Sequence, residues 1–440
     1  MSEGIDTATR PSRALVLHPD MRSQTAGRPA EAALEEAMAL AHALPGIVLT
    51  GGQAVRLPRA HPGTLFGSGK LEELRALIEE AGVDLVLVDG PVSPVQQRNL
   101  EKAWGVKLLD RTGLILEIFA DRARTREGVL QVELAALSYQ RTRLVRAWTH
   151  LERQRGGLGF VGGPGETQIE ADRRAIDTQM VRLKRQLEKV ARTRELHRAA
   201  RRRVPYPVVA LVGYTNAGKS TLFNRLTGAD VMAKDMLFAT LDPTMRAVRL
   251  QGGLEVILSD TVGFISDLPT QLVAAFRATL EEVLEADLII HVRDLSHPEA
   301  AAQAADVETI LTELQVSDSV PRLEFWNKID RLPPDDPALT VAARQAGVFA
   351  VSALTGQGLD AALAAVGAAL DASRRHESLH LPYDEARARA WLYDQGVVAG
   401  ETTDETGTTL EVTWSAPQRR RFQALRAGTG ATAGNTGFEP

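Results

Sequence analysis

The sequence predicts an α/β protein organised around a P-loop domain with a mostly parallel sheet, and three observations support this prediction. An apolar β-type run, a glycine-rich loop and a helix start follow one another in residues 207–226. Over residues 1–110, runs typical of strands alternate with helical patterns, as in small α/β domains. A long helical stretch rich in arginine lies between these two regions. With 440 residues the chain is too long for one compact core, so several domains are expected.

The predicted domain boundaries follow changes in composition along the chain. An α/β part and a helical hairpin precede the P-loop domain, and a small α+β domain follows it. The five predicted segments are 1–110 (α/β part), 111–203 (arginine-rich helical hairpin), 204–373 (P-loop domain), 374–428 (α+β domain) and 429–440 (disordered tail).

Within the α/β part, residues 47–50 and 54–57 flank Gly51-Gly52, a pattern that favours a β-hairpin. The other elements expected there are strands at 13–17, 83–89 and 106–110 and helices at 31–44 and 71–81. In the C-terminal domain we expect a helix at 384–395 and two strands, 396–401 and 408–414.

The P-loop pattern Gly-x-x-x-x-Gly-Lys-Ser begins at Gly213. In such a loop, consecutive backbone N–H groups and the helix dipole attract phosphate, and glycines permit close approach of the backbone. Lys219 is expected to reach the β- and γ-phosphate oxygens, and the Ser220 hydroxyl to bind Mg²⁺. The predicted phosphate-binding residues are Gly213, Tyr214, Thr215, Asn216, Ala217, Gly218, Lys219, Ser220 and Thr221.

Two further segments complete the predicted phosphate and metal site. An Asp at a strand end followed by Gly holds Mg²⁺ through water and senses the γ-phosphate, a pattern met here by Asp260, Thr261, Val262 and Gly263. The first switch is predicted at Phe238, Ala239, Thr240, Leu241 and Asp242, and we place its metal-binding hydroxyl at Thr240 rather than Thr244. The predicted metal ligands are Ser220 and Thr240, and the predicted catalytic residues are Lys219, Thr240 and Gly263.

The predicted base-binding residues favour guanine over adenine. They are Asn327, Lys328, Ile329 and Asp330, after an expected strand, and Ser352, Ala353 and Leu354, after another. The Asp330 carboxylate can accept from guanine N1–H and from its exocyclic amine, a donor pair that adenine lacks. Backbone N–H groups of 352–354 are placed to meet guanine O6. In this order after a P-loop, these motifs predict a P-loop GTPase domain that binds GTP and GDP.

Phe264 follows Gly263 at the position where signalling GTPases often carry the glutamine that orients the attacking water. Phenylalanine cannot orient water, so we expect slow intrinsic hydrolysis and a partner that completes the site. One hypothesis is that Asn216 helps to bind a K⁺ ion that supplies the charge of an arginine finger. The alternative is that Asn216 is a plain loop asparagine.

A second glycine-rich segment, Gly67-Ser68-Gly69-Lys70, departs from the P-loop pattern. Thr64 replaces the leading glycine, and Leu71 stands where the metal-binding hydroxyl belongs. We therefore favour a helix-opening turn over a phosphate site.

The predicted helical hairpin carries many arginines on both sides of a glycine-rich loop at 156–166. Composition alone leaves two interpretations of these arginines open: they cover a solvated helix surface, or they form a surface that contacts the RNA backbone. Its basic residues include Arg141, Arg143, Arg146, Arg153, Arg155, Arg173, Arg174, Arg182, Lys184 and Arg185.

The composition limits the other possibilities. The chain has no cysteine, which excludes disulfides, thiolate metal sites and a cysteine nucleophile. We expect no stable membrane insertion and a cytoplasmic protein, since no apolar run reaches transmembrane length and no signal pattern opens the chain. The net charge is −5, so the whole chain is no polycation. The sequence has no heptad pattern that would indicate a dimer, so we expect a monomer.

Motifs outside the nucleotide domain give the chain a more specific likeness. It resembles the HflX family of P-loop GTPases, related to Obg, over most of its length. The matching segments are 66–70, 94–100, 110–116, 119–123, 131–135, 156–166, 170–174 and 238–242, together with the guanine site.

This resemblance implies that the α/β part and the hairpin engage the large ribosomal subunit and its rRNA near the peptidyl transferase centre, with residues 156–166 as the RNA-probing tip. It further implies a GTPase that is stimulated by that subunit and that separates stalled ribosomes or acts in their biogenesis. The alternative class is a nucleotide-switched scaffold that binds a protein or membrane effector without RNA. A GTP-dependent metabolic kinase would need an acceptor-substrate signature, which the sequence does not show.

Overall fold

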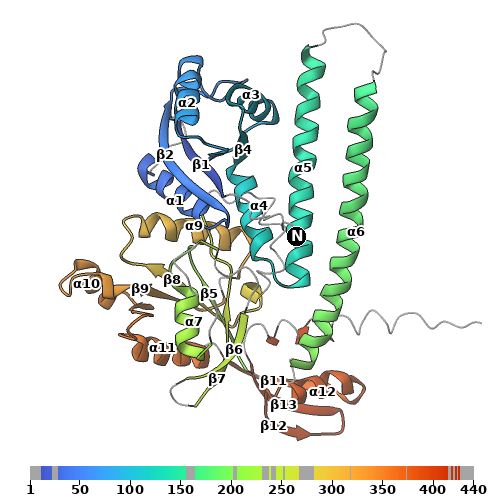
Figure 1. Cartoon of the computed structure of the whole chain (residues 1–440). Coiled ribbons are helices and arrows are strands. Elements are labelled where there is room, and N and C mark those ends of the chain that lie inside the picture. Colours follow the sequence, from blue (N-terminus) through green and yellow to red (C-terminus); the bar gives the residue numbers. More distant parts are fainter. Residues whose placement is uncertain are drawn as a thin grey trace, which may run out of the picture. The chain divides into compact units, whose positions relative to one another are not determined.

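The computed structural model forms two compact units, each described by itself (Figure 1). Unit 1 holds the N-terminal residues through 190 and also Leu237 and Phe238, and unit 2 holds the other described residues. The described residues are 11–21, 28–154, 164–201, 206–229, 237–238, 244–250, 253–266, 282–317, 319–372, 374–414, 418–419, 422–423 and 425–426.

Unit 1 begins with a parallel four-stranded sheet of order β2-β1-β3-β4. Residues 14–17 of β1 are buried without a break because helices cover both faces of the sheet. On one face, Leu15 and Leu17 share a core with Leu74 of α2 and Leu100 of α3. The elements are β1 (Ser12–Met21), α1 (Ala30–His42), β2 (Ile47–Leu57), α2 (Ser68–Glu80), β3 (Leu85–Val88), α3 (Pro94–Trp104) and β4 (Lys107–Asp110).

The predicted β-hairpin at Gly51-Gly52 is wrong. Residues 47–57 form the single strand β2, which runs parallel to β1 with a register shift at Ala14/Leu15. A Cβ on Gly52 would lie 2.6 Å from Met38 Sδ and 3.1 Å from Leu34 Cδ1, both on α1. Glycine is therefore required at position 52 because α1 packs closely against the strand there. A local Gly-Gly pattern, which is typical of turns, does not show this contact.

The other glycine-rich segment behaves as expected. Gly67 is the N-cap of α2, the Leu71 N–H donates to the Gly67 carbonyl at 2.9 Å, and Lys70 pairs with Glu73 at 2.6 Å. The segment is a helix-opening turn, as predicted.

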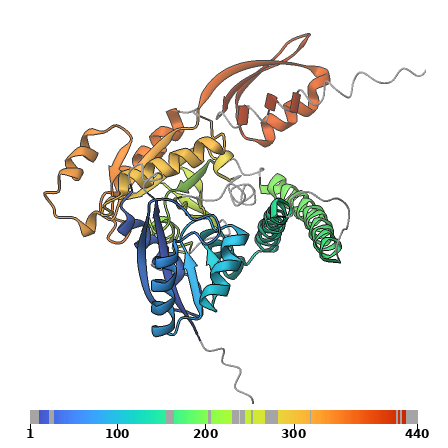
Figure 2. The same cartoon turned by 90° about the horizontal axis from the view of Figure 1, so that it is seen from above.

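Three helices follow the sheet: α4 (Arg111–Arg122), α5 (Arg126–Gln154) and α6 (Pro164–Arg201), of which residues 164–190 belong to unit 1 and 191–201 to unit 2. The two long helices, α5 and α6, lie side by side in both views (Figures 1 and 2) and are joined by a 2.8 Å ion pair between Arg141 and Asp177. We call this pair the α5–α6 hairpin. Residues 164–166 of the predicted glycine-rich loop belong to α6, and residues 156–163 lie outside the described residues.

Unit 2 contains a six-stranded sheet of order β10-β9-β8-β5-β7-β6, parallel except for the β6–β7 pair. It confirms the mostly parallel P-loop domain, and the antiparallel β6 is an edge strand that the sequence reading did not place. Its strands are β5 (Val208–Val212), β6 (Thr244–Arg249), β7 (Glu255–Asp260), β8 (Leu288–Asp294), β9 (Arg322–Asn327) and β10 (Val348–Ala350). Its helices are α7 (Lys219–Thr227), α9 (Ala300–Glu313), η1 (Ile329–Arg331), α10 (Pro337–Arg344) and α11 (Leu359–Ala372).

The C-terminal part of unit 2 is a three-stranded antiparallel sheet of order β11-β13-β12 with one helix. The predicted helix and two strands are present, as η2 (Tyr383–Glu385), α12 (Ala386–Asp394), β12 (Val398–Thr403) and β13 (Gly407–Trp414). A third strand, β11 (Arg375–Pro382), was not predicted, because exposed His376, Ser378 and His380 make the segment read as polar. Across the described residues, no helix is both long and apolar enough to cross a membrane.

Gly51→Ala and Gly52→Ala form a matched test of this packing. Gly52→Ala is expected to lower the free energy of unfolding by about 1–2 kcal/mol, since Leu34 and Met38 must move. A Cβ on Gly51 meets only Leu15 Cδ1 at 4.0 Å, so Gly51→Ala should be neutral or stabilise by up to about 1 kcal/mol. Denaturant unfolding measures both values, and equal losses would refute this explanation.

Candidate nucleotide site

The loop between β5 and α7 has the strained backbone that its glycines predict. Gly213 and Gly218 have φ of 151° and 94°. A Cβ on Gly213 would lie 2.2 Å from the Val292 carbonyl oxygen, and one on Gly218 would lie 2.2 Å from Asn327 Nδ2. Both positions therefore need glycine, because residues of β8 and β9 lie too close for a Cβ.

Lys219 is buried at the start of α7, with its ammonium folded back over the loop. Nζ donates to the carbonyl oxygens of Gly213 at 3.1 Å and of Tyr214 at 2.9 Å. Burial lowers the pKa of Lys219 to about 8, although the Asp260 carboxylate acts in the opposite direction. The cation is thus held in a site where a phosphate would stabilise its charge.

Ser220 and Asp260 supply hard oxygen atoms next to each other. The Ser220 hydroxyl donates to Asp260 Oδ2 at 2.7 Å, and Asp260 is fully buried at the end of β7. Within the described residues, the nearby buried Thr215 hydroxyl makes no hydrogen bond. A hydroxyl beside a buried carboxylate suits Mg²⁺, which prefers oxygen ligands.

The first switch is described only in part. Thr244 begins β6 and pairs with Asp260 in the ladder, so its backbone belongs to the strand. Thr240 lies outside the described residues, as do Ala239, Leu241 and Asp242, and its role stays a prediction. Phe238 is described, but it belongs to unit 1 and is not among the residues gathered here.

The Asp-x-x-Gly segment lies directly against the P-loop. Thr215 N–H donates to the Phe264 carbonyl at 2.7 Å, and Phe264 N–H donates to the Gly213 carbonyl at 3.1 Å. A Cβ on Gly263 would lie 2.9 Å from Thr215 Cα and 3.1 Å from Lys219 Nζ, so only glycine fits there. The Phe264 side chain is 1% exposed, so it packs in the core and has no polar group to orient a water molecule.

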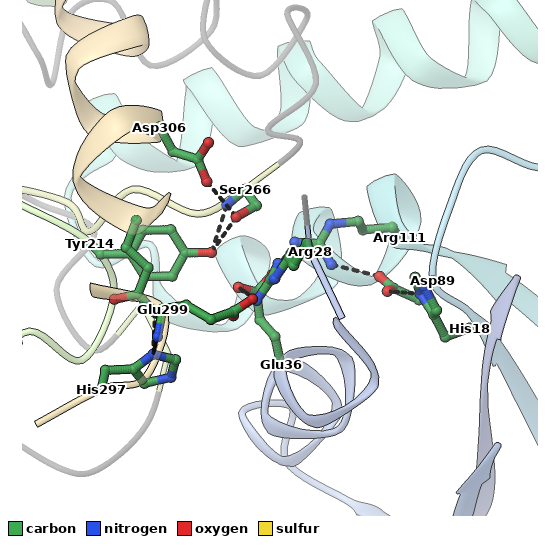
Figure 3. A network of polar contacts seen from close by, with 11 residues as sticks. His18, Arg28, Glu36, Asp89, Arg111, Tyr214, Ser266, His297, Glu299 and Asp306 are labelled. Carbon is green, nitrogen blue, oxygen red and sulfur yellow. Dashed lines mark hydrogen bonds and ion pairs between the residues drawn. The ribbon is translucent and has the colours of Figure 1, made fainter. Parts of the chain in front are cut away.

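A hydrogen-bond chain links the same two segments to α9 (Figure 3). The Tyr214 hydroxyl and Ser266 Oγ are 2.7 Å apart, Ser266 N–H donates to the Tyr214 oxygen at 2.8 Å, and Ser266 Oγ donates to Asp306 Oδ2 at 2.6 Å. Sequence reasoning missed Ser266 and Asp306. Their partners are 52 and 40 residues away, so no local pattern could indicate them.

On the base side, Asn327 joins two loops. Its Nδ2 donates to the Ala217 carbonyl at 2.9 Å, and its Oδ1 accepts from the Ala353 N–H at 2.8 Å. The Ser352 hydroxyl donates to Asp330 Oδ1 at 2.5 Å, and Asp330 is otherwise exposed. Lys328 pairs with Asp294 at 2.7 Å.

Arg225 is a further residue that the motifs did not reveal. From α7 it donates to the carbonyl oxygens of Leu354 at 2.8 Å and Thr355 at 2.7 Å. It thereby holds the 352–354 loop at the same edge of the sheet as the P-loop.

The structure thus gathers the predicted segments 213–221, 260–263, 327–330 and 352–354 at one place. Each segment lies at or just after the carboxyl end of β5, β7, β9 or β10, and these ends meet at one edge of the parallel sheet. This edge is where open α/β sheets bind ligands.

The pKa of Lys219 predicts a pH dependence of phosphate binding. Bound phosphate favours the charged ammonium and raises this pKa, so affinity should be constant below pH 8 and fall by up to about tenfold between pH 8 and 9. Titration with a fluorescent guanine nucleotide from pH 6.5 to 9 measures it. Residual binding by Lys219→Arg should not change over this range, and a flat wild-type profile would contradict the prediction.

Comparison with known proteins identifies relatives over nearly the whole chain. Family models match four successive parts: GTP-binding GTPase N-terminal at 31–120, GTP-binding GTPase Middle Region at 122–201, 50S ribosome-binding GTPase at 208–328, and HflX C-terminal domain at 338–433.

Two relatives show the extent of this similarity. GTPase HflX of Magnetococcus marinus is 52% identical over 367 residues, which are 83% of this chain and 84% of that protein. GTPase HflX of Escherichia coli is 44% identical over 362 residues, with 82% and 84% covered. Among solved structures, a GTP-binding protein from Sulfolobus solfataricus in complex with GDP is 23% identical, with 82% and 98% covered. Its TM-score is 0.44, and this likeness supports no inference about the chain.

Four family models that match successive parts of the chain, and relatives above 40% identity over most of it, agree with the geometry of the nucleotide site. The chain therefore belongs to the HflX family of P-loop GTPases, whose activity is the hydrolysis of GTP.

Proposed function

We propose that this GTPase binds the large ribosomal subunit through the α5–α6 hairpin and acts in the splitting or rescue of stalled ribosomes or in ribosome biogenesis. The observation that carries the proposal is a long basic helix pair built onto a GTPase whose nucleotide domain matches the 50S ribosome-binding GTPase model. The proposal includes contact with rRNA, action as a monomer, and location in the cytoplasm, where ribosomes work.

The described surface of α6 suits an RNA backbone. Six cations are exposed there: Arg173, Arg174, Arg182, Lys184, Arg185 and Lys189. A hollow of about 620 Å³ on α6 is lined by Asp177, Thr178, Val181, Arg182, Arg185, Gln186 and Lys189. Arginine contacts phosphate in pairs of hydrogen bonds, so Arg182 and Arg185 suit contact with a nucleic-acid backbone.

The proposed nucleotide roles are those that the sequence motifs predict. Lys219 binds the β- and γ-phosphates, the Gly263 N–H meets the γ-phosphate, and Asp330 recognises guanine. Ser220 and Thr240 are the proposed Mg²⁺ ligands, with Asp260 acting through water. When bound, Mg²⁺ neutralises charge that develops on the phosphates.

GTP hydrolysis requires a catalytic group from a binding partner, because Phe264 is buried and no glutamine occupies its position. Binding of the large subunit supplies that help in our proposal. A bound K⁺ ion near Asn216 is a further part of it: Asn216 is exposed at the loop tip with φ of 58°.

The K⁺ proposal predicts a cation-specific rate. GTP hydrolysis by the wild type should be faster in KCl than in NaCl at equal ionic strength, and Asn216→Ala should remove the difference. Equal wild-type rates in the two salts would exclude K⁺ binding as a catalytic factor.

Asp330→Asn should change the base preference. The variant loses two charge-assisted hydrogen bonds to guanine, so GTP affinity should fall about 100-fold or more, while xanthosine triphosphate, which offers an acceptor, should bind better than it does to the wild type. Competition with a labelled nucleotide measures both. Asp335→Asn, an exposed carboxylate in the same loop, serves as the control and should bind GTP like the wild type.

The ribosomal role predicts stimulation by purified large subunits. GTP hydrolysis should rise when subunits are added, and deletion of residues 156–165 should remove the increase without changing the unstimulated rate. A wild type that is not stimulated would overturn the proposal. A scaffold that binds protein instead of RNA would retain its binding in high salt.

Single exposed cations provide a finer test of RNA contact. Arg182→Ala and Arg185→Ala should each weaken subunit binding and reduce the salt slope by about 1. Arg75→Ala is the matched control, because Arg75 is an exposed arginine of the same unit that pairs with Glu79 on α2. Equal effects of all three substitutions would contradict a specific contact by α6.

A further inference from the structure

The P-loop contains a tyrosine whose hydroxyl has no role in the phosphate-binding motif. The pattern Gly-x-x-x-x-Gly-Lys-Ser accepts any residue at the position of Tyr214, so the motif does not require a hydroxyl there. The Tyr214 side chain is nevertheless 4% exposed, and buried polar groups are normally paired. The partners of this hydroxyl therefore indicate what the tyrosine does.

The three oxygen groups of the hydrogen-bond chain decide where its protons lie (Figure 3). Ser266 Oγ donates to the Asp306 carboxylate, which can only accept, at 2.6 Å. Because a serine hydroxyl has one proton, Oγ must accept from the Tyr214 hydroxyl, 2.7 Å away. The tyrosine oxygen in turn accepts from the Ser266 N–H at 2.8 Å. Tyr214 and Ser266 thus bind each other twice, and we call the three residues the Tyr214 clamp.

The third member of the clamp is a fixed acceptor, because α9 is held on the sheet of unit 2. The residue after Asp306, Val307, is fully buried, as is Leu311 one turn later. Glu308 pairs with Arg322 at the start of β9, at 2.8 Å. All three clamp residues belong to unit 2. The clamp therefore ties residue 266 to two parts of one domain.

The clamp ends a short segment that is bound to the P-loop along its length. Phe264 forms a parallel bridge with Tyr214: its N–H donates to the Gly213 carbonyl at 3.1 Å, and its carbonyl accepts from the Thr215 N–H at 2.7 Å. The next residue, Ile265, is fully buried. Residues 264–266 are thus held by backbone hydrogen bonds at one end and by the clamp at the other.

Gly263 directly precedes this segment and lies against the P-loop lysine. A Cβ at this position would lie 2.9 Å from Thr215 Cα and 3.1 Å from Lys219 Nζ. Gly263 and Lys219 are the groups proposed above to meet the γ-phosphate. A hydrogen-bond donor stabilises developing charge only when it is already held in the correct place. The residues that hold 264–266 therefore also set the position of the Gly263 N–H.

We propose that Tyr214 is a positioning residue for GTP hydrolysis, which acts through Ser266 and Asp306 to aim the Gly263 N–H at the γ-phosphate. This inference rests on the proposed contact between Gly263 and the γ-phosphate, and it is independent of the ribosomal role. Tyr214 acts through another residue and supplies no group to the reaction itself.

The test separates the rate of hydrolysis from the affinity for nucleotide. Tyr214→Phe removes only the hydroxyl. Single-turnover GTP hydrolysis by the full-length protein should fall about 10- to 100-fold, because one preorganised donor is displaced. The Kd of GDP should change by less than about twofold, because GDP lacks the γ-phosphate and the lost interaction serves the reaction rather than binding.

Two other clamp variants test whether the residues act as a unit. Ser266→Ala should also slow hydrolysis, and the double variant should lose no more than Tyr214→Phe alone, because that substitution already removes both hydrogen bonds between the two side groups. Ser266→Thr, which keeps a hydroxyl, should retain most of the wild-type rate. Independent losses that multiply in the double variant would reject the clamp.

Tyr383→Phe is the matched control, because the Tyr383 hydroxyl donates to the Asp404 carbonyl at 2.7 Å in the C-terminal part of the same unit. It should hydrolyse GTP like the wild type. An unchanged single-turnover rate in Tyr214→Phe would overturn the inference. Equal losses of rate and GDP affinity would also overturn it, since the hydroxyl would then support the whole P-loop. If Tyr214→Phe does not fold, Ser266→Ala decides: a wild-type rate rejects the inference, and a reduced rate with unchanged GDP affinity supports it.

Gly263→Ala separates this inference from the contact on which it rests. The variant should lose most of its GTP hydrolysis, because the added Cβ must push the backbone away from Thr215. A wild-type rate in Gly263→Ala would refute the proposed γ-phosphate contact itself. An impaired Gly263→Ala beside an unimpaired Tyr214→Phe would reject only the role of the tyrosine.

Discussion

The side-chain amide of Asn327 is the interaction on which the nucleotide site depends. It bonds the Ala217 carbonyl on one side and the Ala353 N–H on the other, so the phosphate loop and the base loop share one support. Gly218 must lack a Cβ because this amide occupies the space. If either hydrogen bond of this buried amide were lost, the unpaired group would cost free energy. The amide therefore fixes the positions of the two loops relative to each other. Phosphate binding and base selection are thus parts of one rigid arrangement.

In unit 1, the equivalent role belongs to two adjacent residues at the start of α4. Asp110 accepts from Arg143 of the hairpin and Arg111 pairs with Asp89, so the backbone between them joins two polar networks. Buried charges are tolerated here because each has an opposite charge and hydrogen bonds. Asp89 directly follows β3 and Asp110 ends β4, so both networks begin at the carboxyl ends of neighbouring parallel strands.

The sequence-based predictions were accurate where the interacting residues are close together in the sequence and failed where they are far apart. The segments 213–221, 260–263 and 327–330 come together at one sheet edge because each motif is contiguous and lies at or just after the end of a strand. Their binding roles stay predictions. The pair Gly51-Gly52 was misinterpreted as a turn because Gly52 is required by its packing against Met38 of α1, which a local sequence pattern does not show. Strand β11 was missed because its outward side chains are polar, and Ser266, Asp306 and Arg225 were missed because their partners lie 40 to 130 residues away.

By itself, the sequence determined the position of the P-loop domain, its phosphate-binding motif and the choice of guanine, since these depend on short spacings along the chain. It also determined the arginine-rich character of α5 and α6. Only the tertiary structure decided that Phe264 is a buried packing residue, that Lys219 is held at a lowered pKa, and that Tyr214 is paired with Ser266. Burial and pairing across the fold set these properties, and no spacing within one segment encodes them.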